Sequence, residues 1–303
     1  MIIRPRRSVL YLPGSNARAI AKSRVLDADA IVFDLEDSVA PADKADALAA
    51  AARAVAEGGF GHRETVIRVN GLDTARGRED LVVAARARPD AILLPKVASS
   101  GDVMVAAREL AEAGVPEGVR LWAMVETPAA VLNAADIARA AHDPASRLDV
   151  LVMGTNDLAK DLRARVGPGR EPLLGWLADC VAAARCHGLD ILDGVFNGLD
   201  DPAGLAAEAR QGRDYGMDGK TCILPGQIAI VNAAFAPDPG EVAWARRVVA
   251  AFEGPQGASN VLRIDGRMVE RLHAEEAKRL LAVAEAVAAR GSAGGADAGG
   301  AAL

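Results

Sequence analysis

The chain alternates short apolar runs, rich in β-branched residues, with longer Ala-rich stretches. The apolar runs predict eight strands, at residues 8–12, 30–34, 65–69, 91–94, 121–125, 150–153, 190–193 and 219–222. The stretches between them predict helices such as residues 41–57, 101–113, 128–140 and 201–215. Eight strand–helix units, without the strand-order break of a doubly wound sheet, predict an α/β fold of the (β/α)8 TIM-barrel type.

The residues after the eighth unit exceed what a barrel needs to close. Two helices separated by "APDPG" are followed by an extended stretch, "VLRIDG", and a last helix near residues 273–289. We therefore expect a TIM-barrel catalytic domain at residues 1–236 and a C-terminal helical arm at residues 237–290, packed either on a neighbouring subunit or on its own barrel. The Gly/Ala-rich tail, residues 291–303, has no periodicity and is expected to be disordered.

Composition and charge exclude several classes of function. Hydrophobic residues make up 51% of the 303 positions and charged residues 25%, which are ordinary values for a globular protein. The net charge of −6, without a long basic block, argues against a nucleic-acid partner. No apolar stretch reaches the roughly 18 residues of a membrane helix, and three cysteines without paired spacing suit a reducing compartment. We expect a cytoplasmic protein that contacts neither nucleic acid nor membrane.

Polar residues gather where the predicted strands end. In a TIM barrel the chemistry is built at the carboxyl ends of the strands. In chain order, those ends carry "PGSN", "DLED", Arg68 with Asn70, Lys96, Glu126, "GTND", Asp193 and Lys220. Such a set on nearly every strand predicts an active site at this rim.

Carboxylates dominate the set, whereas all four histidines fall on predicted loops or helices. Carboxylate-rich sites suit a hard cation, and Mg²⁺ usually takes one or two carboxylates together with water and substrate oxygens. Glu126 and Asp157, from adjacent strands, are the predicted ligands of Mg²⁺ or Mn²⁺. The alternative is an ion pair of Glu126 with Arg68 or Lys96 and no metal.

"FDLEDSVAP" places Asp34, Glu36 and Asp37 within four residues. Carboxylates this close repel one another, so either one of them has a raised pKa or the cluster faces positive groups. Asp37 or Ser38 is also placed to cap the helix that begins near Pro41.

"YLPGSNARAIAKS" leads from a strand into a helix that carries Arg18 and Lys22 on one face. A Gly-containing loop before a helix N-terminus with two cations can hold a phosphate group. The same "PGSN" is equally typical of an ordinary loop and helix cap.

Several longer motifs resemble a known family. They are "RSVLYLPGSNARAIAKS", "IVFDLEDSVAPADKADA", "VIRVNGLDT", "LLPKVASSGDV", "MVETPAAVLNAADIA", "LVMGTNDLAKDL", "GMDGKTCILPGQI" and "NAAFAPDPGEVAWARRVVAAFE". Together they resemble the citrate lyase beta subunit-like branch of the hydroxyalkanedioate aldolase and citrate lyase superfamily, over almost the whole chain. The resemblance implies a Mg²⁺-dependent TIM barrel that acts on acyl-CoA thioesters of hydroxydicarboxylates as a trimer or a dimer of trimers.

The resemblance also implies roles for single residues. It agrees with the metal ligands Glu126 and Asp157, and it places Arg68 at the carboxylate and carbonyl oxygens of the substrate. The other implied residues are an acidic pair beside the reacting centre, Glu36 and Asp37; contacts to CoA or the edge of the site, Arg18, Lys22 and Lys96; and the lining of the mouth, Pro128, Gly154, Thr155 and Asn156.

The chain departs from the family pattern near its end. "DGRMVERLH" has Glu270 where the family has an Asp that reaches a neighbouring subunit's site as proton donor or acceptor, and Leu272 where Pro is usual. "KTCILPGQI" has Leu224 where His is common. Glu270 can still move a proton, but its side chain is longer by one methylene, which is enough to change the step that is catalysed. This variant resembles the subgroup that includes (3S)-malyl-CoA thioesterases.

The leading expectation is a carbon–carbon lyase that cleaves a 3-hydroxy-3-carboxyacyl-CoA, of the malyl-CoA or citramalyl-CoA type, to acetyl-CoA and a 2-oxo acid. The alternative is a (3S)-malyl-CoA thioesterase that releases malate and CoA. Two further readings are a citrate lyase beta subunit that acts only within a complex and a barrel that binds CoA for regulation. The expected partners are a CoA thioester, a 2-oxo acid and further copies of the chain in a homotrimer or homohexamer.

Overall fold

The structure is a computed structural model that describes residues 3–254 and 259–296. The chain divides into two compact units. One is Arg6–Phe235, and the other consists of Met1–Pro5 and Ala236–Leu303.

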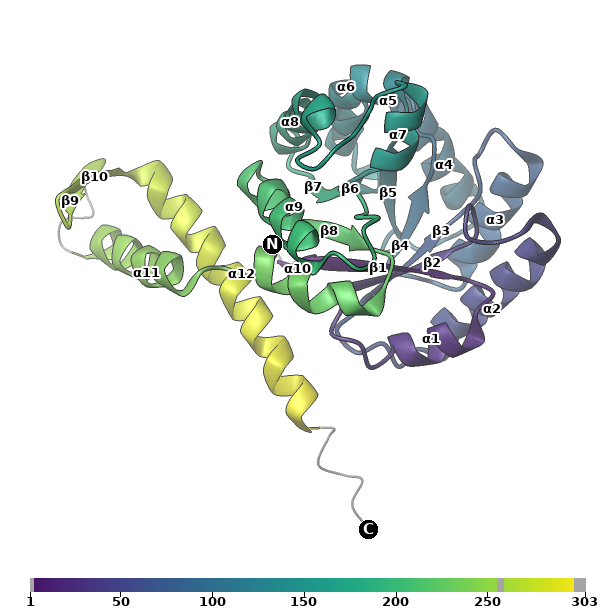
Figure 1. Cartoon of the computed structure of the whole chain (residues 1–303), viewed down its shortest axis with the longest axis horizontal. Coiled ribbons are helices and arrows are strands. Elements are labelled where there is room, and N and C mark those ends of the chain that lie inside the picture. Colours follow the sequence, from purple (N-terminus) through teal and green to yellow (C-terminus); the bar gives the residue numbers. More distant parts are fainter. Residues whose placement is uncertain (1–2, 255–258, 297–303) are drawn as a thin grey trace, which may run out of the picture. The chain divides into compact units, whose positions relative to one another are not determined.

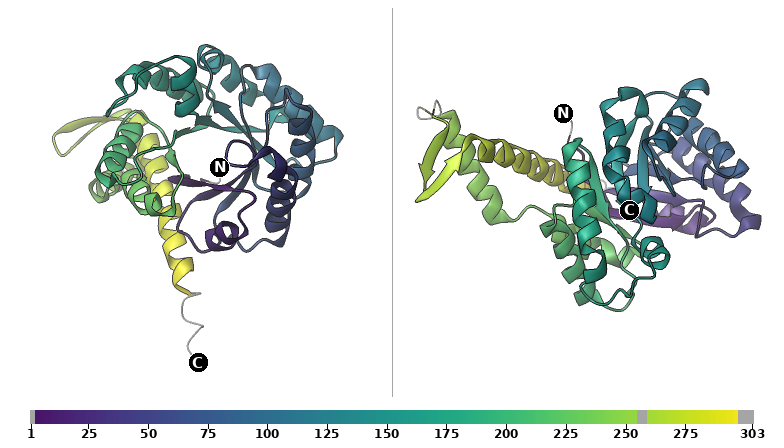
Figure 2. Two further views of the ribbon diagram at one scale, coloured as in Figure 1. Left: turned by 45° about the vertical axis from the view of Figure 1, so that its right-hand side comes forward. Right: turned by 90° about the horizontal axis from the view of Figure 1, so that it is seen from above.

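The first unit is a closed barrel of eight parallel strands in sequential order, surrounded by helices (Figures 1 and 2). The strands are β1 (Ser8–Pro13), β2 (Ala30–Asp34), β3 (Glu64–Arg68), β4 (Ala91–Leu94), β5 (Arg120–Val125), β6 (Leu148–Met153), β7 (Asp190–Asp193) and β8 (Gly219–Cys222). Closure is made by β1 and β8, which pair in parallel with Leu10 opposite Cys222. The predicted TIM-barrel fold is confirmed.

The barrel helices are α1 (Ala17–Ser23), α2 (Lys44–Glu57), α3 (Ala75–Arg86), α4 (Ser100–Glu112), α5 (Pro128–Leu132), α6 (Ala134–Arg139), α7 (Thr155–Asp161), α8 (Glu171–Cys186), α9 (Pro202–Asp214) and α10 (Ile228–Phe235). The predicted helix at residues 128–140 is interrupted at Asn133, whose exposed side-chain amide donates a hydrogen bond to the carbonyl of Ala98. No helix within the described ranges combines the length and apolarity needed to cross a bilayer.

Alternation along each strand builds two apolar layers. On β1, Val9 and Tyr11 belong to the cluster that fills the barrel, while Leu10 and Leu12 belong to the cluster under the helices. This is the period of two that a strand imposes on its side chains. The barrel interior therefore holds a packed core, with Trp122 as its largest side chain.

Charged residues close the end of the barrel where the strands begin. The Arg6 guanidinium contacts Glu64, Asp149 and Asp190 at 2.6–2.8 Å and lies 5.3 Å from the centre of the Trp122 ring. Its acceptors come from β3, β6 and β7. Because this ion cluster closes one end, the other end is left for a site.

The second unit has a core of its own. It contains α11 (Pro239–Glu253), an antiparallel hairpin of β9 (Val261–Ile264) and β10 (Arg267–Glu270), and α12 (Arg271–Ala296). The predicted extended stretch is thus the first strand of a hairpin. The last helix is longer than predicted and includes residues 291–296, since no proline ends it after Arg290. The remainder of the predicted tail, residues 297–303, lies outside the described residues.

Candidate active site

A pocket of about 300 Å³ opens at the carboxyl ends of the strands, and we call it the rim pocket. Its lining includes side chains that follow β2, β3, β5 and β6. Seven residues predicted for the site line it: Asp37, Arg68, Glu126, Gly154, Thr155, Asn156 and Asp157. The strand ends therefore bring together residues that lie far apart in the sequence.

Arg68 is held in one orientation at the end of β3. Its Nε and Nη2 donate to the two carboxylate oxygens of Asp34 at 2.7 Å each, in the bidentate geometry that suits guanidinium. Its Nη1 lies 2.8 Å from Glu36 Oε2 and 3.6 Å from Asp37 Oδ2. Burial alone would raise the pKa of Asp34, but the hydrogen bonds and charge of Arg68 outweigh it and hold that pKa below its usual value. Asp34 thus positions the guanidinium.

Glu36 is the carboxyl group of this cluster with an unusual pKa. Burial raises the pKa of Glu36 to about 7, and the nearby charges of Asp37 and Glu126 add to the rise while Arg68 opposes it. The cluster therefore shows both outcomes expected of three close carboxylates: one of them has a raised pKa, and the cluster faces the positive guanidinium of Arg68.

The expected helix cap at Asp37 or Ser38 is wrong. The first helical turn after this cluster, Pro41–Asp43, has Ala40 at its N-cap position and no side-chain cap. The backbone N–H groups of Glu36 and Ser38 instead donate to Asp34. Asp34 therefore stabilises this turn as well as Arg68.

Glu126 directly follows β5 and is 2% exposed. Its Oε1 accepts a hydrogen bond from the backbone N–H of Lys96 at 2.7 Å and lies 3.4 Å from the Lys96 ammonium. That ammonium also contacts Asp157 Oδ2. Of the two ion-pair partners weighed for Glu126, the structure shows Lys96, while Arg68 pairs with Asp34 and Glu36. Burial raises the pKa of Glu126, and the hydrogen bond and charge of Lys96 oppose the rise.

The pair Glu126 and Asp157 fits a magnesium ion. One cationic group, the Lys96 ammonium, already contacts both carboxylates, so both are within reach of a single charge. No group of three or more metal-binding His, Cys, Asp or Glu side chains occurs in the described part of the chain. Two carboxylates with water and substrate oxygens are nevertheless a common Mg²⁺ environment. The Lys96 side chain is 40% exposed on a flexible stem and can move toward the mouth.

Gly154 gives Glu126 its space. A Cβ at position 154 would lie 2.3 Å from the Cβ of Glu126 and 2.8 Å from its Oε2. The φ angle of Gly154 is −97°, so backbone conformation does not require glycine here. The requirement is steric, because a side chain would displace the carboxylate.

Other predicted site residues lie elsewhere. Pro128 does not line the rim pocket, because it forms the first turn of α5 beside the capping Thr127. Arg18 and Lys22 are exposed on α1, where Asn16 accepts a hydrogen bond from the N–H of Ala19 as a helix cap.

Glu270 belongs to the second unit. Its place in a neighbouring site therefore stays a prediction, as do the CoA contacts of Arg18, Lys22 and Lys96.

Two strand-end residues point away from the rim. Asp193 accepts from Arg170 Nη1 at 2.6 Å and from Lys220 Nζ at 2.9 Å, and Lys220 also donates to Glu208 at 2.7 Å. Asp193 and Lys220 are fully buried. They form a structural ion network beside α9 rather than part of the rim.

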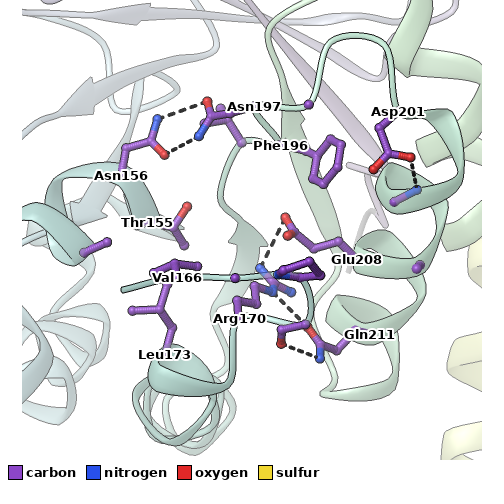
Figure 3. A pocket seen from close by; sticks show the side chains of 18 residues that line it. Thr155, Asn156, Val166, Arg170, Leu173, Phe196, Asn197, Asp201, Glu208 and Gln211 are labelled. Carbon is purple, nitrogen blue, oxygen red and sulfur yellow. Dashed lines mark hydrogen bonds and ion pairs between the residues drawn. The ribbon is translucent and has the colours of Figure 1, made fainter. Parts of the chain in front are cut away.

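This network borders a second cavity of about 440 Å³, the side pocket (Figure 3). Thr155, Asn156 and Val195 line both pockets, so the two adjoin. Asn156 and Asn197 face each other there and exchange two amide hydrogen bonds of 2.7 and 3.3 Å (Figure 3). The sequence does not predict the side pocket, because its walls combine residues of α7, α8 and α9 with loop residues that carry no sequence signature.

Tyr11 and Asp34 are the ionisable residues of the rim pocket that the predicted site residues do not include. Asp34 was recognised only as part of an acidic cluster. Tyr11 lies in an apolar run. The feature of the sequence that could have indicated a role in the site is a hydroxyl group at an inward-facing position near the end of β1.

Comparison with known proteins fits this site. Residues 7–225 match the HpcH/HpaI aldolase/citrate lyase family. The chain belongs to that family. Members named "(3S)-malyl-CoA thioesterase" from Cereibacter sphaeroides are 49% identical over 94% of this chain and 96% of theirs. The citrate lyase subunit beta of Escherichia coli is 34% identical over 93% and 94%.

A solved family structure shows the same fold. The protein CitE from Mycobacterium tuberculosis, in complex with magnesium, acetoacetate and coenzyme A, has a TM-score of 0.73 and 29% identity. The match covers 93% of this chain and all of that one. The family is enzymatic and its named members here act as thioesterases or citrate lyase subunits.

The lyase expectation is overturned by these relatives. Four thioesterase relatives are 47–49% identical over nearly the full length, whereas the citrate lyase subunits are 32–34% identical. The motifs that carry the resemblance did not separate the two activities, because thioesterases and citrate lyase subunits both match this chain over more than 90% of its length.

Proposed function

We propose that this protein hydrolyses the thioester of (3S)-malyl-CoA and releases malate and CoA. The observation that carries the proposal is the 49% identity to (3S)-malyl-CoA thioesterases over 94% of the chain. The geometry supports it, because the rim pocket combines a fixed guanidinium with two carboxylates that contact one cation, and Glu36, behind the lining, contacts that guanidinium and has a pKa of about 7.

We infer that Mg²⁺, or Mn²⁺ in its place, is held by Glu126 and Asp157. The inference is supported by the oxygen donors of this pair and by the magnesium bound in the related CitE structure. When bound, the ion supplies positive charge to the hydroxyl and carboxylate oxygens of the malyl group.

The chain's own residues orient the substrate and the attacking water. Arg68 presents a guanidinium fixed by Asp34 to the carboxylate of the malyl group. Glu36, whose pKa of about 7 leaves it partly ionised at neutral pH, takes a proton from the attacking water. The water oxygen bonds to the thioester carbon, the carbon–sulfur bond breaks, and the sulfur leaves with its electron pair and takes up the proton.

Charge at the edge of the site suits the CoA moiety. Arg18 and Lys22 are exposed cations on α1, which follows directly from β1. We assign them to the phosphates of CoA, and Lys96 to the edge of the mouth. Glu270 is assigned to proton transfer in the site of a neighbouring copy, within a homotrimer or homohexamer.

The test is a product analysis with purified protein, (3S)-malyl-CoA and Mg²⁺. Hydrolysis predicts free thiol and malate in equal amounts, without an added protein partner. Formation of glyoxylate and acetyl-CoA in place of malate contradicts the proposal.

A further inference from the structure

The hydroxyl of Tyr11 is a polar group that forms no hydrogen bond within the described part of the chain. The atom is buried, and it has no hydrogen-bond partner among the residues that the structure describes. Buried polar groups are nearly always hydrogen-bonded, because leaving one unpaired costs free energy. An unpaired group that persists in a pocket indicates a partner that arrives with the ligand.

Tyr11 lies in the wall of the rim pocket. It shares that lining with Arg68, Glu126 and Asp157. Its ring lies 5.2 Å from the Arg68 guanidinium carbon, a cation–π distance that fixes the ring in place. The hydroxyl is therefore positioned beside the groups assigned to the substrate.

The hydroxyl remains a hydrogen-bond donor under all ordinary conditions. Burial raises the pKa of Tyr11, and the negative charges of Asp34, Glu126 and Glu36 add to the rise while Arg68 opposes it. The phenol thus stays protonated.

Two neighbouring donor groups already have partners, although each Nη of Arg68 keeps a second N–H for the carboxylate of the substrate. Arg68 directs its Nε and Nη2 to Asp34 and its Nη1 to Glu36. The Thr221 hydroxyl donates to the carbonyl of Asp193 at 2.9 Å. Tyr11 offers a neutral donor that gives up no existing hydrogen bond when a ligand enters.

We propose that the Tyr11 hydroxyl donates a hydrogen bond to the thioester carbonyl oxygen of the substrate. The proposal rests on the thioesterase function. When water attacks the carbonyl carbon, the π electrons of the carbonyl bond move onto its oxygen, and Tyr11 stabilises the charge that develops there. As the carbon–sulfur bond breaks, those electrons re-form the carbonyl bond, and the hydroxyl keeps its proton throughout.

The substitution Tyr11→Phe separates this role from a structural one, because the two predict opposite signs. Removing an unpaired buried hydroxyl should leave the midpoint of urea unfolding unchanged or raise it. Loss of an oxyanion donor should lower kcat by on the order of 100-fold, with KM within about twofold of the wild type. Tyr215→Phe is the matched control, since Tyr215 is the second of the two tyrosines and is 38% exposed. It should change neither quantity.

Three results would overturn the proposal for Tyr11. Unchanged turnover in Tyr11→Phe shows that the hydroxyl has no catalytic part. A raised KM with unchanged kcat shows that the hydroxyl binds the ground state and the transition state equally and does not stabilise the developing charge. Loss of stability together with activity shows that it holds the fold. If the wild-type protein itself releases no CoA from malyl-CoA, the proposed function fails and takes this inference with it, so the two failures are distinguishable.

A spectroscopic measurement checks the contact without turnover. In the Tyr215→Phe variant Tyr11 is the single remaining tyrosine, so its ultraviolet difference spectrum can be followed on binding a thioether analogue that keeps a carbonyl group. A tyrosine difference band that is absent with the analogue lacking the carbonyl oxygen supports the hydrogen bond. Equal spectra with both analogues overturn it.

Discussion

The carboxylates around Arg68 differ in how completely their charge is matched. Asp34 receives both oxygen contacts from Arg68, so its pKa is held low. Glu36 contacts the same guanidinium but is also beside Asp37 and Glu126, and its pKa rises to about 7. One arginine thus creates a permanent anion and a group that exchanges its proton near neutral pH, which is the property that a general base needs.

This difference predicts the pH dependence of the reaction. Because the base form of Glu36 is the ionised one, kcat/KM should rise with pH through a transition near 7 and level off above it. Glu36→Gln should lower the rate at high pH and remove the transition. Rates measured from pH 5 to 9 on both proteins provide the check, and a transition that survives in Glu36→Gln would assign the base to another group.

The raised pKa of Glu36 also makes the stability of the fold depend on pH, in the opposite direction from the activity. The folded protein binds the Glu36 proton more tightly than the unfolded chain does. This contribution is therefore fully present below the unfolded pKa near 4.5 and is lost as pH rises through about 7. The site accordingly becomes reactive in the range where Glu36 stops stabilising the fold.

At the scale of elements, the chain between β4 and α4 places a cation on the proposed metal ligands. Lys96 adopts a left-handed conformation, with φ of 53°, which costs a non-glycine residue free energy. Its backbone N–H binds Glu126 while its ammonium contacts Glu126 and Asp157. The loop therefore places one positive charge against both carboxylates.

Magnesium binding should release the Lys96 ammonium from these carboxylates, since two cations at one site repel each other. Acylation of Lys96 by an amine-reactive reagent, read by mass spectrometry of its peptide, should rise at least severalfold when Mg²⁺ is added. Lys160, which is exposed on α7, serves as the internal control and should not change. Unaltered labelling of Lys96 at saturating Mg²⁺ would refute the displacement.

The buried network beside α9 is a test of stability rather than of chemistry. Lys220→Met removes a fully buried ammonium that contacts Asp193 and Glu208, and we expect a loss of ~3 kcal/mol in the free energy of unfolding. The double variant with Asp193→Asn should lose less than the sum of the two single losses, because the two groups share one interaction. Urea unfolding measures all four proteins; strictly additive losses would mean that the pair is not coupled.

The strands were predictable, and the contacts between them were not. Most of the strand positions follow from apolar runs, because a barrel strand is buried on both faces and its composition records this directly, whereas β8 reads "GKTC" and has no such run. The break of a helix at Asn133 depends on a hydrogen bond to Ala98, which is remote in sequence. Asp193 ends β7 and Lys220 is the second residue of β8, and both side chains contact residues of the helical layer instead of the rim. A shift of one residue along the strand decides whether a side chain faces the barrel interior or the helices, and composition does not reveal that shift.

For the whole molecule, the question is how a second unit with its own core serves a barrel site. Val248, Leu262, Val269 and Ala277 pack within that unit, so it is a folded element rather than a loose tail. It carries Glu270 at the end of β10. The proposed oligomer provides a reason for such a unit, since it can bring Glu270 to the site of another copy.

Mixed oligomers test that arrangement. Arg68→Ala and Glu270→Ala should each be nearly inactive alone, whereas co-expressed subunits with different tags should regain activity. Activity returns because some sites then combine an intact barrel with an intact Glu270 from a neighbour. Purified mixed oligomers that stay as inactive as their parents would place Glu270 in the site of its own chain or outside catalysis.

The most direct test of the account is the fate of (3S)-malyl-CoA in water enriched in heavy oxygen, with Mg²⁺ present. The account predicts one labelled oxygen in the newly formed carboxylate of malate for each CoA released, with no glyoxylate. It also predicts that Glu126→Ala abolishes this Mg²⁺-dependent turnover while the fold is retained. Unlabelled malate, glyoxylate as product, or full activity of Glu126→Ala without added metal would contradict the central claim.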